Sequence, residues 1–219
     1  RKRYSLPVRV DNNAKAMVLG EFWFGNGKGV DNLLAVKIGH TIGSGIILNG
    51  HLYSGTNYSA GEIGHLSVVF DGLQCKCGNY GCLETVASLG AIIKRGRLLL
   101  KQKEGSDLLE FIGSNPHDLN FESLCFAAES GQRLALQLWE EAGNYLGLAL
   151  ANTINILNPT KVLLGGDILP ALDFILPKIR DIVEARSFKT IKTTTIIEEA
   201  GLGFDAVSVG AATLVFKDI

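Results

Sequence analysis

The sequence contains no long uninterrupted apolar run, although 47% of its 219 residues are hydrophobic. Since a membrane-spanning helix needs about 20 consecutive apolar residues, we expect no membrane span. The chain also lacks an excess of charge of either sign, because 21 lysines and arginines stand against 22 aspartates and glutamates. A protein with this balance has no general electrostatic attraction for nucleic acid. No internal repeat or low-complexity segment is present.

Cysteine is also scarce, and four cysteines in a chain of this length do not suggest a disulfide scaffold. We therefore expect a reducing compartment and, because no secretory signal pattern opens the sequence, a cytoplasmic protein. An initiating methionine is missing, and a strand expected over Leu6 to Val10 follows the first few residues. These two features predict that an N-terminal portion is missing. The length suffices for one large domain or two small ones.

Residues 61–84 contain the side chains best suited to a metal site. One imidazole and three thiols follow the spacing His-x9-Cys-x-Cys-x4-Cys, at His65, Cys75, Cys77 and Cys82. This set fits a closed tetrahedral zinc site, in which the ion is structural because no coordination position stays open. Glycines allow the turns of such a loop, at Gly72, Gly78 and Gly81. The alternatives are cysteines buried as small hydrophobes or a disulfide, although a Cys-x-Cys disulfide would be strained.

Two carboxylates, Glu62 and Glu84, flank this cluster. A folded metal loop would hold both near each other and near His65. Carboxylates on a rigid scaffold are good acceptors for hydroxyl groups, and a sugar is a ring of hydroxyls. The alternative is a pair of solvated glutamates that cap helices.

Strand-like and helix-like apolar patterns alternate along the chain, which predicts an α/β layered domain. We expect strands at residues 6–10, 32–38, 46–48, 51–53, 161–164 and 193–197, and helices at 14–24, 83–102, 107–112, 121–129, 132–157, 169–185 and 206–216. Asn49 and Gly50 predict a tight hairpin turn. Asn12 and Asn13 precede the first helix, where they would either cap it or face a ligand at the carboxyl end of a strand.

Two glycine-rich segments follow predicted strands, Gly39 to Gly45 and Gly165-Gly166-Asp167. Backbone N–H groups in such turns hold phosphate, although any tight turn favours glycine. We expect His40, in the first of them, to be solvated. The basic end of the helix over 83–102 could contact an anion, but a solvated face is favoured because cations suit a helix C-terminus.

These motifs occur together in an order typical of one family: Asp11-Asn12-Asn13-Ala14-Lys15, the Gly39 to Gly45 turn, Ala60 to His65, Cys75 to Glu84, and Gly165-Gly166-Asp167. In this the chain resembles the ROK family of bacterial sugar kinases and sugar-responsive transcriptional repressors, over nearly all of residues 1–219. The resemblance implies an actin-like, ribonuclease-H-like sugar kinase fold. Most of the chain would form its C-terminal lobe, with a structural zinc loop.

The resemblance also implies roles for single residues. Zinc would be bound by His65, Cys75, Cys77 and Cys82. A sugar or amino sugar would be contacted by Asn12, Asn13, Glu62, His65 and Glu84. Remnants of an ATP site would lie at Thr41, Gly43, Gly165 and Gly166. Family members are commonly dimers or tetramers, so we expect a homodimer or homotetramer.

Two departures from the family pattern bear on function. Kinases of the family have Asn-Asp where this chain has Asn12-Asn13, and the aspartate takes the proton from the sugar hydroxyl. An amide cannot act as that base near neutral pH. The usual Gly-Thr-Gly of the phosphate turn is replaced by Gly39-His40-Thr41. The N-terminal phosphate loop of the family and the winged helix-turn-helix of its repressors are both missing from this chain.

The sequence therefore predicts a sugar-sensing lobe of a transcriptional regulator, which binds a sugar without phosphorylating it. Operator DNA would be read by a winged helix-turn-helix outside this chain. The alternatives are an active ATP-dependent sugar kinase with an unusual base and a zinc-stapled interaction module without a ligand.

Overall fold

The computed structural model describes residues 9–102, 105–192 and 194–215. Its centre is a mixed five-stranded sheet with the strand order β3-β2-β1-β4-β5. Strand β1 pairs antiparallel with β2 and parallel with β4, β2 pairs antiparallel with β3, and β4 pairs parallel with β5. The elements are α1 (Asn13–Phe24), β1 (Leu33–Ile38), β2 (Ile42–Leu48), β3 (His51–Leu52), α2 (Glu84–Ala87), α3 (Leu89–Lys101), α4 (Ser106–Phe111), α5 (Phe121–Glu129), α6 (Arg133–Leu157), β4 (Lys161–Gly165), α7 (Leu172–Arg186), α8 (Lys189–Lys192), β5 (Ile196–Glu199) and α9 (Ala206–Thr213).

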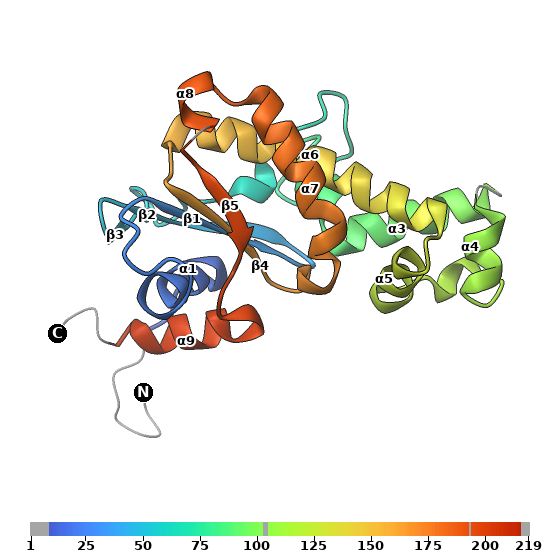
Figure 1. Ribbon diagram of the computed structural model, residues 1–219, viewed down its shortest axis with the longest axis horizontal. Coiled ribbons are helices and arrows are strands. Elements are labelled where there is room, and N and C mark those ends of the chain that lie inside the picture. The colour runs from blue at the N-terminus through green and yellow to red at the C-terminus, as the bar shows by residue number, and fades with distance from the viewer. Residues whose placement is uncertain (1–8, 103–104, 193, 216–219) are drawn as a thin grey trace.

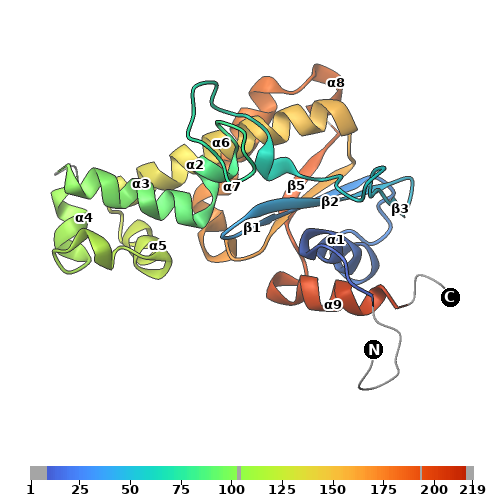
Figure 2. The same ribbon diagram turned by 180° about the vertical axis from the view of Figure 1, so that it is seen from behind.

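Helices cover the sheet on both faces, α1 and α9 on one and α6 and α7 on the other (Figures 1 and 2). The burial of strand β1 between these two helical layers explains why its sequence is almost wholly apolar. Leu33 and Ala35 point into the core under α1 and α9, whereas Leu34 and Val36 point into the core under α6 and α7. A strand buried on both faces has no solvent side, so it shows a continuous apolar run instead of alternation.

Helices α3, α4 and α5 pack against the first half of α6 and extend the molecule to one side of the sheet (Figure 1). Leu124 and Trp139 are fully buried in this part. Among the described residues, no helix has both the length and the apolar character needed to cross a bilayer.

Most of the predicted elements are confirmed, including the helix over 121–129 and the long helix, which begins at Arg133. The hairpin turn is confirmed by φ angles of 51° at Asn49 and 77° at Gly50. Several boundaries were wrong, and β2 begins at Ile42, four residues before its predicted start. Strand β5 begins at Ile196, residues 169–171 form a 3-10 turn before α7, and the last helix ends at Thr213. Helix α8 was not predicted. Residues 9 and 10 are in no strand, while residues 6–8 and 216 lie outside the described part.

The single helix predicted over 83–102 is two helices, because Ser88 interrupts it. The backbone of Ser88 is extended, with φ −71° and ψ 155°, and its side chain accepts a hydrogen bond from the Ala91 N–H at 3.3 Å. A serine in this role begins a helix. The first of the two helices, α2, begins at Glu84.

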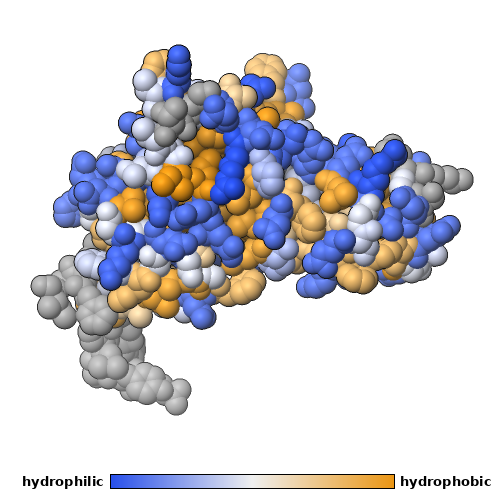
Figure 3. Space-filling view, viewed as in Figure 1, coloured by the Kyte–Doolittle hydropathy of each residue, from blue (hydrophilic) through white to orange (hydrophobic). Residues whose placement is uncertain are grey.

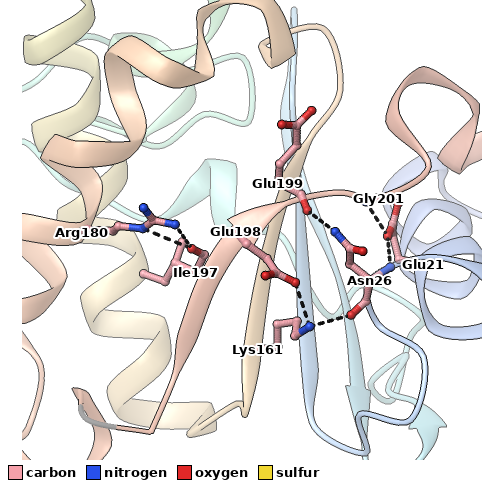
Figure 4. A network of polar contacts seen from close by, with 8 residues as sticks. All are labelled: Glu21, Asn26, Lys161, Arg180, Ile197, Glu198, Glu199 and Gly201. Atoms are coloured by element: carbon pink, nitrogen blue, oxygen red, sulfur yellow. Dashed lines mark hydrogen bonds and ion pairs between the residues drawn. The ribbon is translucent and has the colours of Figure 1, made fainter.

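Backbone carbonyl groups of the edge strand β5 accept hydrogen bonds from side chains of other elements (Figure 4). Arg180 of α7 donates to the Ile197 carbonyl at 2.7 Å, and the Asn26 amide donates to the Glu199 carbonyl at 3.0 Å. Apolar surface is visible over this region in Figure 3, and Ile196 is 52% exposed. Because an open apolar edge can pair with another chain, these two donors protect the sheet against strand addition.

A buried carboxylate, Glu21, joins α1 to the loop that follows β5 (Figure 4). Its exposed fraction is 0%, and it accepts from the backbone N–H groups of Asn26, Gly201 and Leu202 at 2.8–2.9 Å. A buried carboxylate is tolerated only when its lone pairs are satisfied in this way. These three hydrogen bonds, called the Glu21 clamp below, fix the C-terminal end of α1 against the segment that leads into α9.

We expect Glu21→Gln to lower the free energy of unfolding by about 2–4 kcal/mol, since a hydrogen bond to a buried charge contributes about 1.5–3 kcal/mol and an unsatisfied donor costs more. The amide keeps one acceptor oxygen but turns an NH2 group toward backbone donors. Urea denaturation measures the change. Glu110→Gln, at an exposed position of α4, is the matched control and should change stability by less than about 0.5 kcal/mol. Equal effects of the two substitutions would contradict the clamp.

Candidate functional site

The four predicted metal ligands lie together. One ligand atom from each of His65, Cys75, Cys77 and Cys82 lies within 4.8 Å of the others. The Cys75 sulfur is 3.5 Å from His65 Nδ1, and the sulfurs of Cys77 and Cys82 are 3.7 Å apart. A tetrahedral zinc ion, with Zn–S near 2.3 Å and Zn–N near 2.0–2.1 Å, separates such pairs by about 3.6 and 3.8 Å. The donor set therefore fits a metal ion.

The backbone of the loop holds the ligands in place. Residue 65 ends a short 3-10 helix, Ile63–His65, and bridges pair Ser67 with Cys82 and Gln74 with Tyr80. Gly78 and Gly81 have φ angles of 92° and 66°, as the glycine pattern predicted, whereas Gly72 has no positive φ angle. A Cβ atom at Gly81 would collide with the Val69 carbonyl. The turn thus needs glycine for both conformation and space.

The thiols of Cys77 and Cys82 differ electrostatically. The backbone N–H of Asn79, with help from neighbouring sulfurs, lowers the pKa of Cys77, which is exposed. Burial raises the pKa of Cys82 to about 12. A cation among the sulfurs would offset that burial and favour the Cys82 thiolate, which is the form that binds metal.

His65 connects the cluster to the predicted sugar site. Its Nδ1 faces the Cys75 sulfur, whereas its Nε2 lies 4.0 Å from a carboxylate oxygen of Glu62. The Glu62 side chain is 51% exposed and that of His65 34% exposed. One ring nitrogen thus faces the metal ligands, and the other faces a carboxylate that solvent can reach.

The segment that carries Glu62 and His65 lies along the start of β2. The Ser44 N–H and hydroxyl both donate to the Gly61 carbonyl, at 2.9 and 2.8 Å. A Cβ atom at Gly64 would collide with the Ile42 carbonyl, so the glycine permits this close approach. Glu84 reaches the same strand, since its carboxylate accepts from the Ile42 N–H at 3.1 Å.

The N-terminal end of α1 contacts this part of β2 from another side. A Cβ atom at Gly43 would lie 3.4 Å from Ala14. Asn12 caps the helix, because its side-chain oxygen accepts from the Ala14 N–H at 2.8 Å, and both Asn12 and Asn13 are exposed. The capping role of Asn12 is confirmed, and its ligand role stays a prediction that rests on the free amide NH2.

Sequence reasoning missed a buried lysine beside these asparagines. Lys15 is only 3% exposed, and its ammonium donates to the Tyr58 carbonyl at 2.6 Å and lies 4.0 Å from Asp11. It ties the first turn of α1 to the loop that leads to Glu62. Its position inside an apolar helical run was the available signal. The predicted sugar residues thus lie on three segments that all contact residues 42–44.

The predicted phosphate turn is shorter than expected. Strand β2 already begins at Ile42, so Gly43 is paired with Lys37 of β1 and lies outside any loop. Thr41 and Gly166 follow the ends of β1 and β4, as predicted, whereas Gly165 is the last residue of β4 and not part of the turn. Asp167 lies against Gly39 and 4.0 Å from the Lys37 ammonium. A carboxylate therefore lies beside the turn where a phosphate was expected.

A groove of about 920 Å³ opens next to His40 and Asp167. Basic side chains of α3 line it, at Lys94, Arg95, Arg97 and Lys101. Two of them already have partners, since Arg97 donates to the Leu119 carbonyl and Arg95 lies 3.7 Å from Glu141. The expected solvated face is confirmed for Lys94, Arg95 and Lys101, which are exposed, but not for the half-buried Arg97. None of the five predicted sugar residues lines the groove.

A mixed sheet between two helical layers, with a loop folded against its second strand, defines an α/β protein whose Cys3His cluster could hold a metal ion. The chain belongs to the ROK family, whose model matches residues 1–218. This confirms the family resemblance and the sugar-kinase-like α/β fold.

Kinases and regulators are both among its relatives. It is 38% identical to a glucokinase of Halalkalibacterium halodurans, over 96% of this chain and 64% of that protein. It is 33% identical to the xylose repressor of Caldicellulosiruptor bescii, over 100% of this chain and 54% of the repressor. A crystal structure of a ROK family transcriptional regulator, a homologue of the E. coli MLC protein, superposes with a TM-score of 0.86 at 36% identity, over 96% of this chain and 52% of that one. The chain thus spans between half and two thirds of these relatives.

Proposed function

We propose that the chain is the sugar-sensing effector lobe of a ROK transcriptional regulator and binds a sugar or amino sugar without phosphorylating it. The observation that carries the proposal is Asn13, exposed at the first turn of α1. Phosphoryl transfer to a sugar needs a base for the hydroxyl proton, and an amide does not titrate near neutral pH. Asn13 still donates and accepts hydrogen bonds, so binding is kept while chemistry is lost.

Sugar binding is supported by the acceptors around β2. Glu62 offers a half-exposed carboxylate, and His65 offers Nε2. The Glu84 carboxylate accepts from the Ile42 N–H of β2, and the residue after the two asparagines, Ala14, lies against Gly43 of the same strand. Charged acceptors make the stronger hydrogen bonds to hydroxyl groups. A glucokinase and a xylose repressor among the relatives are both named for sugars.

We propose that the ion of the Cys3His cluster is zinc and that it is structural. Three thiolates and one imidazole are ligands that zinc prefers, and they fill all four positions. Zinc would supply only rigidity. With Nδ1 turned to the cluster, His65 presents Nε2 to Glu62 and to a sugar hydroxyl.

Sugar binding would regulate DNA binding through a change of population. A winged helix-turn-helix outside this chain would contact operator DNA, and a homodimer or homotetramer in the cytoplasm would exchange between bound and released states. The sugar shifts this equilibrium only if its affinity for the two states differs. The predicted sugar-binding residues lie on three separate segments. This arrangement suits the requirement, because a movement between the segments would change the number of contacts that the protein makes with the sugar.

The second candidate is an active sugar kinase. The identity to a glucokinase favours it, as does the groove beside His40 and Asp167. Against it stand Asn13, the pairing of Gly43 in the sheet and the Lys37–Asp167 pair next to the turn.

Isothermal titration of the full-length protein with a panel of sugars and amino sugars tests the proposal. We expect one sugar class to bind, and we expect Glu62→Gln to weaken its affinity roughly ten- to a hundredfold, as loss of a hydrogen bond to a charged group requires. Glu129→Gln, at an exposed position of α5, is the matched control and should bind normally. If no sugar gave heat, the sensor would be wrong. Binding that Glu62→Gln left unchanged would mean that the site lies elsewhere.

A further inference from the structure

The metal cluster has one member that solvent reaches easily. Cys77 is exposed, whereas Cys75 and Cys82 are buried. Cys77 also has a close partner, since its sulfur is 3.7 Å from that of Cys82. Cys75 instead lies nearest His65, with 3.5 Å between the Cys75 sulfur and Nδ1. An accessible sulfur beside a second sulfur is the arrangement found in cysteine pairs that respond to oxidants.

We propose that Cys77 and Cys82 form a peroxide-sensitive pair whose oxidation releases the metal and loosens the sugar site; this rests on the proposed zinc and sugar functions. The Cys77 thiolate attacks one oxygen of hydrogen peroxide, the O–O bond breaks, and a sulfenic acid and hydroxide form. The Cys82 thiolate then attacks the sulfenic sulfur, which forms the S–S bond and expels a second hydroxide. Two thiolates are oxidised by two electrons, and one peroxide is reduced.

Geometry favours this pair over the other two. A disulfide needs its sulfurs at about 2.05 Å, so Cys77 and Cys82 must close by less than 2 Å. Four residues separate them, whereas a single residue separates Cys75 from Cys77, and so short a loop strains the bond. The remaining pair, Cys75 and Cys82, is buried and not exposed to peroxide.

Oxidation would act on the ligand site through His65. Two of the four ligands are lost in the disulfide, so His65 and Cys75 alone would hold the ion. The new disulfide would close residues 77–82 in place of the ion, and the base of the loop is paired, since Leu83 donates to the Leu66 carbonyl and Val68 to the Gly81 carbonyl. The loop would therefore stay attached while the His65 ring, no longer fixed by a metal, would turn freely beside Glu62.

Zinc release and peptide mapping test the proposal on the full-length, zinc-loaded protein. Trypsin cuts after Lys76, so Cys75 falls in the peptide 38–76 and the other two cysteines in the peptide 77–94. After hydrogen peroxide treatment we expect peptide 77–94 to lose two hydrogens, peptide 38–76 to keep a free thiol, and zinc to appear in a colorimetric chelator in equal amount. Dithiothreitol with added zinc should reverse both changes.

Cys125 supplies the control, because this buried cysteine lies outside the cluster. Cys125→Ser should respond to peroxide like the parent protein, while Cys77→Ser should keep Cys75 and Cys82 as free thiols after the same treatment. If zinc stayed bound under conditions that oxidise Cys125 or added free cysteine, the redox switch would be wrong. The proposed zinc and sugar functions would not be affected by that result. Peptides 38–76 and 77–94 cross-linked to each other would overturn the choice of pair. Protein purified without any zinc would overturn the proposed metal, and the switch with it.

Discussion

Replacing Asn13 with aspartate should raise sugar-dependent ADP release from the full-length protein by about 10²–10⁴-fold, the contribution typical of a positioned general base. The substitution exchanges one terminal nitrogen for oxygen at an exposed position, so it places a proton acceptor there without altering the packing of α1. A coupled ADP assay over the sugar panel measures the effect. We expect the parent protein to show little turnover and the same sugar to bind in both.

Asn12→Asp is the matched control for this experiment. It makes the same chemical change one residue earlier, and an aspartate caps a helix as well as the asparagine that now accepts from the Ala14 N–H. If Asn12→Asp matched the rate of Asn13→Asp, the gain would be a general effect of charge. A parent protein that already turns over at a kinase rate would end the non-catalytic proposal. A sugar-binding Asn13→Asp variant without turnover would place the block at the nucleotide turn, where Asp167 lies beside Gly39.

The sequence was most informative where local chemistry leaves few alternatives. The buried strand β1 was predictable because its apolar run is too short for a helix. The turn at Asn49 and Gly50 was predictable because both residue types tolerate a positive φ angle. The grouping of His65 with the cysteines follows from donor types that have few other uses at that spacing. In each case a few neighbouring residues decide the outcome.

Other features depend on partners far away in the sequence, and spacing alone does not identify those partners. Glu21 lies within the helix predicted over 14–24, but the N–H groups that satisfy its buried carboxylate belong in part to residues 201 and 202. Gly43 looked like part of a loop, but β1 extends β2 by pairing with it. Ser88 lies inside the helix predicted over 83–102, but its side chain caps the start of α3. The predicted sugar residues share this difficulty, because they approach residues 42–44 from three segments.

Removing the metal from the Cys3His cluster should open the loop that supplies its ligands, and this is the second large effect that we expect. We expect a strong chelator to withdraw about one ion per chain, by the count of four ligands. Binding of such an ion contributes directly to the folding of the loop that supplies its ligands. The large core between α1, α9, α6 and α7 contains no ligand, so it should stay folded with a lower melting temperature, while the loop opens. Trypsin should then cut after Lys76 many times faster than in the metal-loaded protein.

Sugar affinity should fall with the metal, by at least about tenfold, the scale on which loss of a supporting group weakens a site. The reason is His65, whose ring orientation beside Glu62 is set by the cluster on its other side. Cys75→Ser should reproduce the cleavage and the weaker sugar binding without any chelator, whereas Cys125→Ser should not. A chelated protein whose Lys76 stays protected would show that the backbone pairs around residues 66–69 and 80–83 suffice to hold the loop. Unchanged sugar affinity after confirmed metal loss would remove the link between the cluster and the binding site, because a freely turning imidazole cannot hold one fixed hydrogen bond.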